Sequence, residues 1–490
     1  MLSAKDVLLS PPVAGLLNFT TRNDHVRGAI MKVAERKLYG RLVEENPYAC
    51  PLRVQEDKFY VVRNMMYSLD RALRDGAVSP QVKQKLLRIF VGKIFSEDIN
   101  ARRAFKEEHG ASPPTFLLLS PGKRCNLRCT GCYASSSRAD AEKLDYDLVD
   151  RIMTEKTELW HSHFTVISGG EPTMWRSQGK GILDLARAHP DNFFLMYTNG
   201  TLINEAFARE LAEVGNITPA ISVEGFEKET DARRGEGTHR KIREAFGNLK
   251  KAGVPFGISV TATRFNAEQL MSDAFIDYYF EEQGALYGWI FQYMPIGRKF
   301  TLDLMVTPEQ RAWMYEREQR LIRERKIFMA DFWNSGALSD GCISAGRGGG
   351  YFYIDWNGDC APCAFFPYAT HNIVEVYKNG GDLNTVLQCP FFQGVRKWQS
   401  EYSYQKPADQ VGNQIVPCVT KDHHRVAHEA VKRFGAYPLD KAGAEALEDE
   451  GYYEGMVAYG KEVARLTDPI WERDYIGPER MRGVAMQAAS

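Results

Sequence analysis

Between residues 113 and 310 the sequence alternates short apolar stretches with helical ones, and this rhythm constrains the fold more than any other feature. Helical stretches such as Leu144–Leu159 and Arg240–Ala252 separate the predicted strands. Those strands are Phe116–Leu119, Phe164–Ser168, Phe193–Tyr197, Pro219–Val223, Gly257–Thr261 and Gly288–Tyr293. Alternation at this spacing favours right-handed βαβ units around a parallel sheet. The residues just after each strand are therefore the first candidates for a site, because ligands of parallel sheets bind at the carboxyl ends of the strands.

The 490 residues are too many for one ordinary core, and the pattern changes at several points along the chain. Residues 1–112 predict a helical N-terminal extension, 113–310 the βα domain, and 311–338 a connecting helix. Residues 339–425 form a second, cysteine-rich module, and 426–490 a helical tail. The simplest interpretation is that the extension packs on the main domain. Apolar residues in Tyr60–Leu69 and Leu86–Phe95 leave a peripheral membrane contact as the alternative.

Charge and cysteine usage limit the partners and the compartment. The chain has 62 Lys and Arg against 63 Asp and Glu, so no overall charge draws it to nucleic acid, and we expect no such partner. No apolar run approaches the roughly 20 residues of a membrane span. Adjacent prolines at 11 and 12 interrupt any signal-peptide core. Nine cysteines, an odd number, favour a reducing cytoplasm and metal ligation over a disulfide framework.

Three of the cysteines follow the first predicted strand in a C-x3-C-x2-C loop, Cys125, Cys129 and Cys132. Thiolates hold iron–sulfur clusters or zinc, and one short loop can occupy three corners of a cubane. A zinc site would need a fourth ligand nearby, and no His or Cys follows before His161. An open fourth corner leaves one iron free to chelate a substrate.

This loop resembles the signature of the radical S-adenosylmethionine (radical SAM) enzymes. The resemblance implies a partial (β/α)6 barrel in the α/β class. It also implies a 4Fe–4S cluster on the three cysteines, whose fourth iron is chelated by SAM. Reduction then cleaves SAM and yields a 5'-deoxyadenosyl radical. The sequence departs from the family at the residue before the last cysteine, which is commonly aromatic in the family and is Gly131 here, with Tyr133 following.

The ends of the later strands agree with this resemblance. The second strand runs into Ser168-Gly-Gly-Glu-Pro172, which is similar to the family's GGEP motif for the methionine amino group. In similar enzymes a serine after the fourth strand and an arginine after it contact SAM, which implies Ser222 and Arg234, with Arg233 as the alternative register. The implied cofactor-binding residues are Tyr133, Gly169, Gly170, Glu171, Pro172, Thr198, Asn199, Ser222, Arg234 and Ile296.

The remaining cysteines suggest a second metal site. Cys342 and Cys363 bracket a predicted β-hairpin that turns at Asn357-Gly358. The pattern resembles the opening of the SPASM or Twitch auxiliary-cluster modules, although the full SPASM cysteine series is missing. Resemblance and the C-x2-C spacing give the ligand set Cys342, Cys360, Cys363 and Cys418 for an auxiliary 4Fe–4S cluster. Zinc is the rival metal, Cys389 is interpreted as an ordinary buried cysteine, and His423 or His424 could replace a ligand.

The resulting functional hypothesis is a radical SAM enzyme that abstracts a hydrogen atom from a C–H bond. Such modules often accompany the maturation of peptides, so a peptide is the first substrate class and a lipid or isoprenoid the second. A flavodoxin or ferredoxin would supply the electron. The alternative from another class is a non-catalytic iron–sulfur electron carrier, which the open corner and Gly169–Pro172 disfavour.

Overall fold

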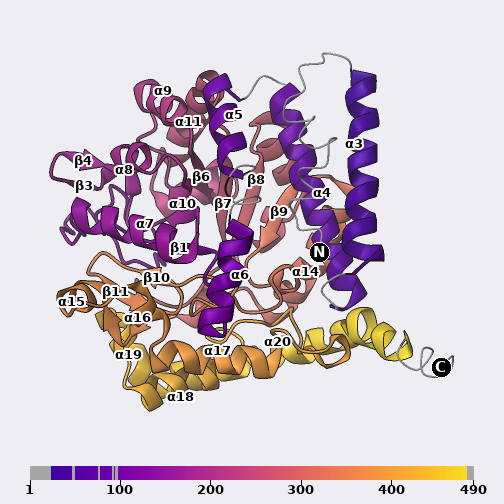
Figure 1. Cartoon of the computed structure of the whole chain (residues 1–490), viewed down its shortest axis with the longest axis vertical. Helices are drawn as coiled ribbons and strands as arrows, with labels where there is room; N and C mark the ends of the chain where they lie inside the picture. The colour runs from indigo at the N-terminus through magenta and orange to yellow at the C-terminus, as the bar shows by residue number, and fades with distance from the viewer. Residues whose placement is uncertain (1–23, 47–49, 75–77, 91–92, 94–97, 483–490) are drawn as a thin grey trace.

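The computed structural model describes residues 24–46, 50–74, 78–90, 93 and 98–482, and one ten-stranded sheet runs through them (Figure 1). Seven neighbouring strands are parallel: β1 (Phe116–Leu119), β2 (Phe164–Ile167), β5 (Phe193–Thr198), β6 (Ile217–Val223), β7 (Gly257–Ala262), β8 (Tyr287–Gln292) and β9 (Phe328–Asp331). The sheet is open, with β13 (His371–Asn372) at one edge and β9 at the other. The predicted α/β class and all six predicted strands are confirmed, each to within two residues at either end.

The seventh strand, β9, differs from the prediction of a connecting helix over 311–338. Helix α14 (Pro308–Glu324) ends before the predicted boundary at residue 338, and β9, which follows it, pairs with β8. All four residues of β9 are buried. Three apolar residues and an aspartate next to a charged helix have no periodicity of their own, so the sequence pattern could not separate the strand from the helix.

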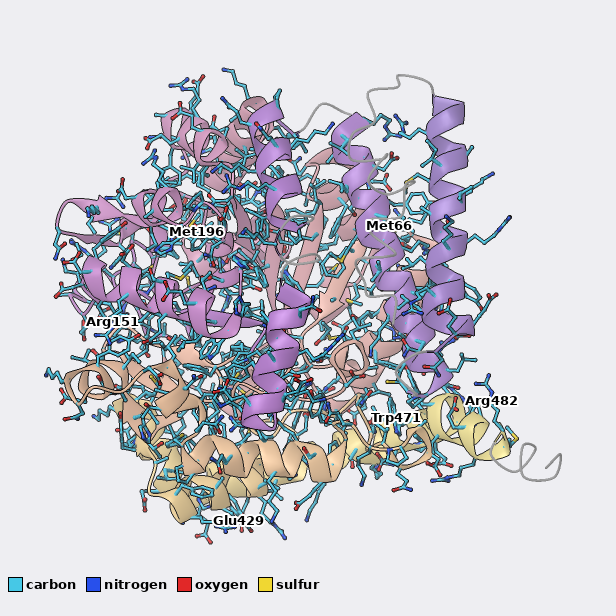
Figure 2. The ribbon with its side chains drawn as sticks, in the orientation of Figure 1. Met66, Arg151, Met196, Glu429, Trp471 and Arg482 are labelled. Atoms are coloured by element: carbon cyan, nitrogen blue, oxygen red, sulfur yellow. The ribbon has the colours of Figure 1, made fainter. Side chains whose placement is uncertain are left out.

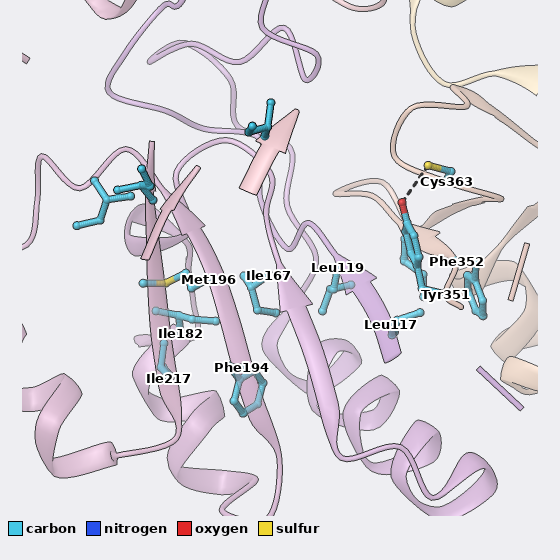
Figure 3. Packing of buried hydrophobic residues seen from close by; sticks show 14 of the residues in the cluster. Leu117, Leu119, Ile167, Ile182, Phe194, Met196, Ile217, Tyr351, Phe352 and Cys363 are labelled. Atoms are coloured by element: carbon cyan, nitrogen blue, oxygen red, sulfur yellow. Dashed lines mark hydrogen bonds between the residues drawn. The ribbon is translucent and has the colours of Figure 1, made fainter. Parts of the chain in front are cut away.

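Side chains alternate between the two faces of the sheet. Leu117, Leu119, Ile167 and Phe194 point to the face covered by helices (Figure 3). These covering helices are α7 (Tyr146–Trp160), α8 (Ile182–Ala188), α9 (Glu205–Val214) and α11 (Thr238–Ala252). The opposite face carries a smaller apolar cluster that includes Val166. Because strand side chains alternate, the residues that follow the strands on this second face reach the interior of the open barrel.

The helical N-terminal extension packs partly on the edge of the sheet and partly on the covering helices. It consists of α3 (Asp24–Tyr39), α4 (Leu52–Arg74), α5 (Pro80–Leu87) and α6 (Asp98–His109). Figure 1 shows α3 and α4 side by side, and Val61 of α4 packs against Phe328 and Ala330 of β9. Most apolar side chains of Tyr60–Leu69 thus contact α3 and the sheet edge, although Met65 is exposed. Part of Leu86–Phe95 lies outside the described residues. In the part of the chain that is described, no helix is long and apolar enough to cross a membrane.

The cysteine-rich module continues the same sheet. Strand β10 (Tyr353–Ile354) pairs in parallel with β1 and antiparallel with β11 (Asp359–Ala361), which confirms the predicted hairpin. The chain then forms α17 (Pro390–Tyr402), α18 (His424–Phe434), α19 (Lys441–Glu448) and α20 (Glu450–Trp471). Trp471 lies below the N-terminal helices and shares a core cluster with Val54 of α4 (Figure 2). The end of α20 is therefore packed on α4 of the N-terminal extension.

Candidate active site

The three cysteines of the first motif lie in the loop that leaves the carboxyl end of β1. Arg298 fixes this loop from the far side of the barrel. Its backbone N–H donates to the carbonyl of Cys132 at 3.0 Å, and its guanidinium Nη1 donates to the carbonyl of Cys129 at 2.6 Å. The backbone N–H of Cys125 donates to Ser137 at 3.0 Å. The loop is thus held by its backbone, which leaves the thiols free to bind a metal.

The three thiols belong to one short loop, in which Cys125 is buried and Cys129 and Cys132 are partly buried. Burial raises the pKa of the Cys125 thiol to about 12, and Cys129 and Cys132 also contribute to the rise. The backbone N–H of Leu127 points at the Cys125 sulfur, with 3.4 Å between N and Sγ. Since thiolates are the metal-binding form, iron binding would displace the Cys125 proton.

The unusual Gly131 has a structural reason. Its φ of +65° is left-handed, and a Cβ on it would lie 2.6 Å from the ring of Tyr293. The space that an aromatic residue before the last cysteine would need is therefore occupied by Tyr293. Tyr133 instead points along the barrel, where its hydroxyl lies 2.7 Å from Ser168 Oγ and accepts the Gly169 N–H at 3.3 Å.

The Ser168–Pro172 segment lies directly against the start of the cysteine loop. The backbone N–H of Gly170 donates to Gly122 at 2.9 Å, and that of Glu171 donates to Arg124 at 2.9 Å. A Cβ on Gly170 would lie 2.1 Å from the Lys123 carbonyl oxygen. Glycine is required here because the two backbones touch.

We expect Gly170→Ala to separate these two loops and to prevent stable iron loading, because backbone atoms cannot yield as a flexible side chain can. Gly247→Ala is the matched control, since a Cβ at this position of α11 would meet nothing within 4 Å. The control should be as stable as the parent or more so, by up to about 1 kcal/mol. Iron content after anaerobic reconstitution and urea unfolding test both variants. Full iron loading in Gly170→Ala would show that the contact is not needed.

The carboxylate of Glu171 is buried and surrounded by protein donors. One oxygen accepts the hydroxyls of Thr198 and Thr173, both at 2.7 Å, and the other accepts the backbone N–H of Asn199 at 2.8 Å. Burial raises the pKa of Glu171, and these hydrogen bonds act in the opposite direction. The structure thus places Glu171, Thr198 and Asn199 together as a brace between β2 and β5, which gives Glu171 a structural task beside the predicted contact with an ammonium group.

Glu224, the residue directly after β6, contacts both candidate arginines. Its buried carboxylate forms ion pairs with Arg233 and Arg234, and its second oxygen accepts the Thr261 N–H at 3.1 Å. Arg234 Nη1 lies 3.9 Å from the Cys129 sulfur, whereas Arg233 donates to the Thr130 carbonyl at 3.1 Å. Arg234 is therefore the arginine that faces the thiols. No role was predicted for Glu224, although its position directly after a predicted strand was an available signal.

The other predicted cofactor-binding residues lie in different surroundings within the barrel. Ser222 Oγ lies 3.1 Å from Ser259 Oγ on the neighbouring strand, and both are on the interior face. Pro172 begins a short turn behind Glu171. Ile296 is buried in an apolar cluster that also contains Tyr293 and Met294. The contacts of Ser222, Arg234 and Ile296 with SAM stay predictions.

A second set of thiols surrounds a cavity of about 260 Å3 beside β8 and β9. Cys342, Cys363 and Cys418 all line it. The Tyr351 hydroxyl lies 2.9 Å from the Cys363 sulfur (Figure 3). Two backbone N–H groups also point at these sulfurs, that of Phe365 at Cys363 (3.4 Å) and that of Lys421 at Cys418 (3.3 Å). Hydrogen bonds of this kind tune clusters that are held by thiolates.

Cys360 does not line this cavity, which argues against its place in the predicted ligand set, and that place stays a prediction. It lies in β11, where side chains alternate, and its sulfur is 3.6 Å from the Gly358 carbonyl and near Cys389. Cys389 is buried at the start of α17, as expected of an ordinary core cysteine. His423 and His424 are also absent from the cavity walls, because each ring is hydrogen-bonded to a backbone carbonyl, of Val416 and Thr420 respectively.

Both thiol sets fit an iron–sulfur cluster by their chemistry. Each brings three sulfurs to one region, with N–H donors aimed at the sulfurs. Among the residues described, no three His, Cys, Asp or Glu side chains are close enough together to hold a single metal ion. The two sites are connected: Tyr133, next to Cys132, lies 5.9 Å between ring centroids from Phe365, which lines the second cavity.

This fold and site define a radical SAM enzyme. A family model described as "Radical SAM superfamily" matches residues 119–273, and one relative is 30% identical over 90% of its own length. The chain therefore belongs to the radical SAM superfamily, whose members use SAM and a 4Fe–4S cluster.

That relative is the mycofactocin maturase MftC of Mycobacterium ulcerans, and the match covers 70% of the present chain. The AdoMet-dependent heme synthase of Methanosarcina barkeri is 25% identical over 51% of this chain and 77% of its own. Among solved structures, SuiB of Streptococcus suis bound to precursor peptide SuiA matches with a TM-score of 0.50 at 19% identity. This match covers 64% of the present chain and 76% of SuiB, and it supports the fold.

Proposed function

We propose that the protein abstracts a hydrogen atom from a C–H bond of a peptide and so acts as a peptide maturase. The relatives support this substrate class, because MftC is named a maturase and the SuiB structure contains a precursor peptide. When bound, SAM and its cluster would supply the 5'-deoxyadenosyl radical. The task of this chain is to bind, orient and shield the reacting groups.

The observation that carries the proposal is the aromatic wall between the two thiol sites. Phe365 lies two residues after Cys363, and its ring is 5.0 Å from Trp333, 5.8 Å from Phe332 and 5.9 Å from Phe291. Tyr133 extends this wall to the cysteine loop. A substrate side chain that lies against this wall would be near both thiol sites, and the aromatic rings would exclude water from it.

The residues proposed to hold the groups follow from this arrangement. Cys125, Cys129 and Cys132 would hold the SAM-binding cluster, and Cys342, Cys363 and Cys418 the auxiliary cluster. Arg234, beside Cys129, is suited to an anionic group of SAM because its charge is held in place by buried Glu224. An apolar or aromatic side chain of a peptide fits the wall through ring contacts.

The test follows deuterium from substrate to product. A perdeuterated candidate precursor peptide is incubated anaerobically with the enzyme, SAM and titanium(III) citrate, and 5'-deoxyadenosine is analysed by mass spectrometry. We expect 5'-deoxyadenosine carrying one additional deuterium. A perdeuterated isoprenoid diphosphate serves as the matched control. Transfer from the isoprenoid and none from the peptide would replace the peptide with the lipid-type substrate.

A further inference from the structure

Two hydroxyl groups lie against sulfurs of the second thiol set. The Tyr351 hydroxyl is 2.9 Å from Cys363 Sγ, and the Ser344 hydroxyl is 3.2 Å from Cys342 Sγ. A thiolate that binds a metal carries no proton, so in a loaded site only the hydroxyls can donate. Both contacts then become charge-assisted hydrogen bonds, which are the stronger class.

The packing around Tyr351 fixes the direction of its hydroxyl. The side chain is buried, and its ring stacks on Phe116 of β1 with 4.8 Å between centroids and 16° between planes. The backbone N–H of Tyr351 donates to the Ile343 carbonyl at 2.9 Å. Figure 3 shows the hydroxyl pointing at the Cys363 sulfur. Because the group is buried, no solvent competes for this hydrogen bond.

A neighbouring amide decides where the Ser344 proton points. Gln399 Nε2 donates to the Ser344 carbonyl at 3.0 Å and to Ser344 Oγ at 3.2 Å. A carbonyl can only accept, so the amide presents its nitrogen to Ser344. Since Oγ accepts this hydrogen bond, its own hydrogen can point at Cys342. Ser344 and Gln399 are both buried, which also shields this contact from water.

The two thiol sets differ in the donors that face their sulfurs. In the second set every sulfur has at least one, because the backbone N–H groups of Phe365 and Lys421 add to the two hydroxyls. In the described part of the chain, the donors near the sulfurs of the first set are nitrogen atoms at 3.4 to 3.9 Å, from Leu127, Asn199 and Arg234. Close hydroxyl donors therefore distinguish the second site.

We infer that the hydroxyls of Tyr351 and Ser344 set the reduction potential of the auxiliary cluster on Cys342, Cys363 and Cys418. This inference rests on the proposed function, which assigns the cluster to these thiols. A low-potential reductant gives up one electron and the cluster gains it, with no covalent bond made or broken. Donated hydrogen bonds stabilise the more negative form and so make the potential less negative. Tyr351 and Ser344 are positioning residues, because they act through the cysteines that they contact.

A redox titration with dithionite, followed by EPR, tests both hydroxyls without SAM or peptide. The Cys125→Ala/Cys129→Ala/Cys132→Ala background identifies the signal of the second cluster, and the titration is repeated on the full iron-loaded enzyme. For Tyr351→Phe we expect the equilibrium constant of reduction to fall about tenfold, which is a potential about 59 mV more negative. Ser344→Ala should shift the potential in the same direction but less, because its oxygen lies farther from the sulfur.

Tyr368→Phe is the matched control. Tyr368 is also buried, but its hydroxyl donates to the Gly443 carbonyl at 2.8 Å. The control thus removes a buried hydroxyl and one hydrogen bond, and the potential should stay at the parental value. The iron content of each variant shows that the cluster is retained. Ser344→Ala leaves the aromatic packing intact and decides the test if Tyr351→Phe loses its iron.

The inference is overturned if Tyr351→Phe and Ser344→Ala both keep about four irons at the second site and titrate at the parental potential. It is also overturned if Tyr368→Phe shifts the potential as far as Tyr351→Phe does. A parent without iron at the second site would contradict the proposed auxiliary cluster itself, and the iron count shows this before any titration.

Discussion

Replacing Cys363 by Ser should halve the iron of the anaerobically reconstituted enzyme, from about eight atoms per chain to about four. The same replacement of Cys360 should leave the iron content unchanged. Both residues are buried members of one C-x2-C pair, so the comparison holds the burial and the chemistry of the change constant. Only Cys363 lines the cavity with Cys342 and Cys418.

The reason lies in the hairpin. Cys360 is within strand β11, where its sulfur lies 3.6 Å from the Gly358 carbonyl. Cys363 has left the strand and lines the cavity, with the Tyr351 hydroxyl beside it. Iron content by ferrozine assay and the visible spectrum measure the result. Equal iron loss in both variants would return Cys360 to the ligand set. A parent with about four irons and one equivalent of zinc would identify the second site as a zinc site.

Replacing Arg311 by Met should lower the free energy of unfolding by about 3 to 5 kcal/mol. Arg311 of α14 and Asp422 form an ion pair in which both side chains are fully buried. Arg311 also donates to the Ile415 carbonyl at 2.9 Å, and Asp422 accepts the Cys418 N–H at 3.0 Å. The pair therefore fixes the segment that brings Cys418 to the second cavity.

The loss of stability comes mainly from the buried Asp422 carboxylate, which has lost its cationic partner. The double variant Arg311→Met/Asp422→Leu should recover a large part of the lost stability, because it removes the unpaired carboxylate as well. Urea unfolding of the parent, both single variants and the double variant gives the coupling energy. A double variant whose loss equals the sum of the two single losses would mean that the pair is not coupled.

The strands of the barrel could be predicted because each is a short apolar run between clear helices. The two motifs at strand ends were predictable for the same reason, since Cys125–Cys132 and Ser168–Pro172 follow β1 and β2 directly. Strand β9 was missed because three apolar residues and an aspartate after a charged helix carry no periodic pattern of their own.

The direction of individual side chains and the contacts between distant residues could not be predicted from the sequence pattern. The spacing of Cys360 and Cys363 is that of a chelating pair, but the strand alternation of β11 turns one of them away. Glu224 is one of many acidic residues until the fold places it between Arg233 and Arg234. The contact of Val61 in α4 with β9 joins residues more than 250 positions apart, which no local pattern predicts.

Formation of 5'-deoxyadenosine tests the central claim most directly. The iron-loaded parent, given SAM and titanium(III) citrate without oxygen or peptide, should release 5'-deoxyadenosine slowly but measurably. The Cys125→Ala/Cys129→Ala/Cys132→Ala variant should release none while it keeps about four irons in the second site. A fully loaded parent that forms no 5'-deoxyadenosine, and whose EPR signal does not change with SAM, would contradict the enzyme assignment and favour an electron-transfer protein.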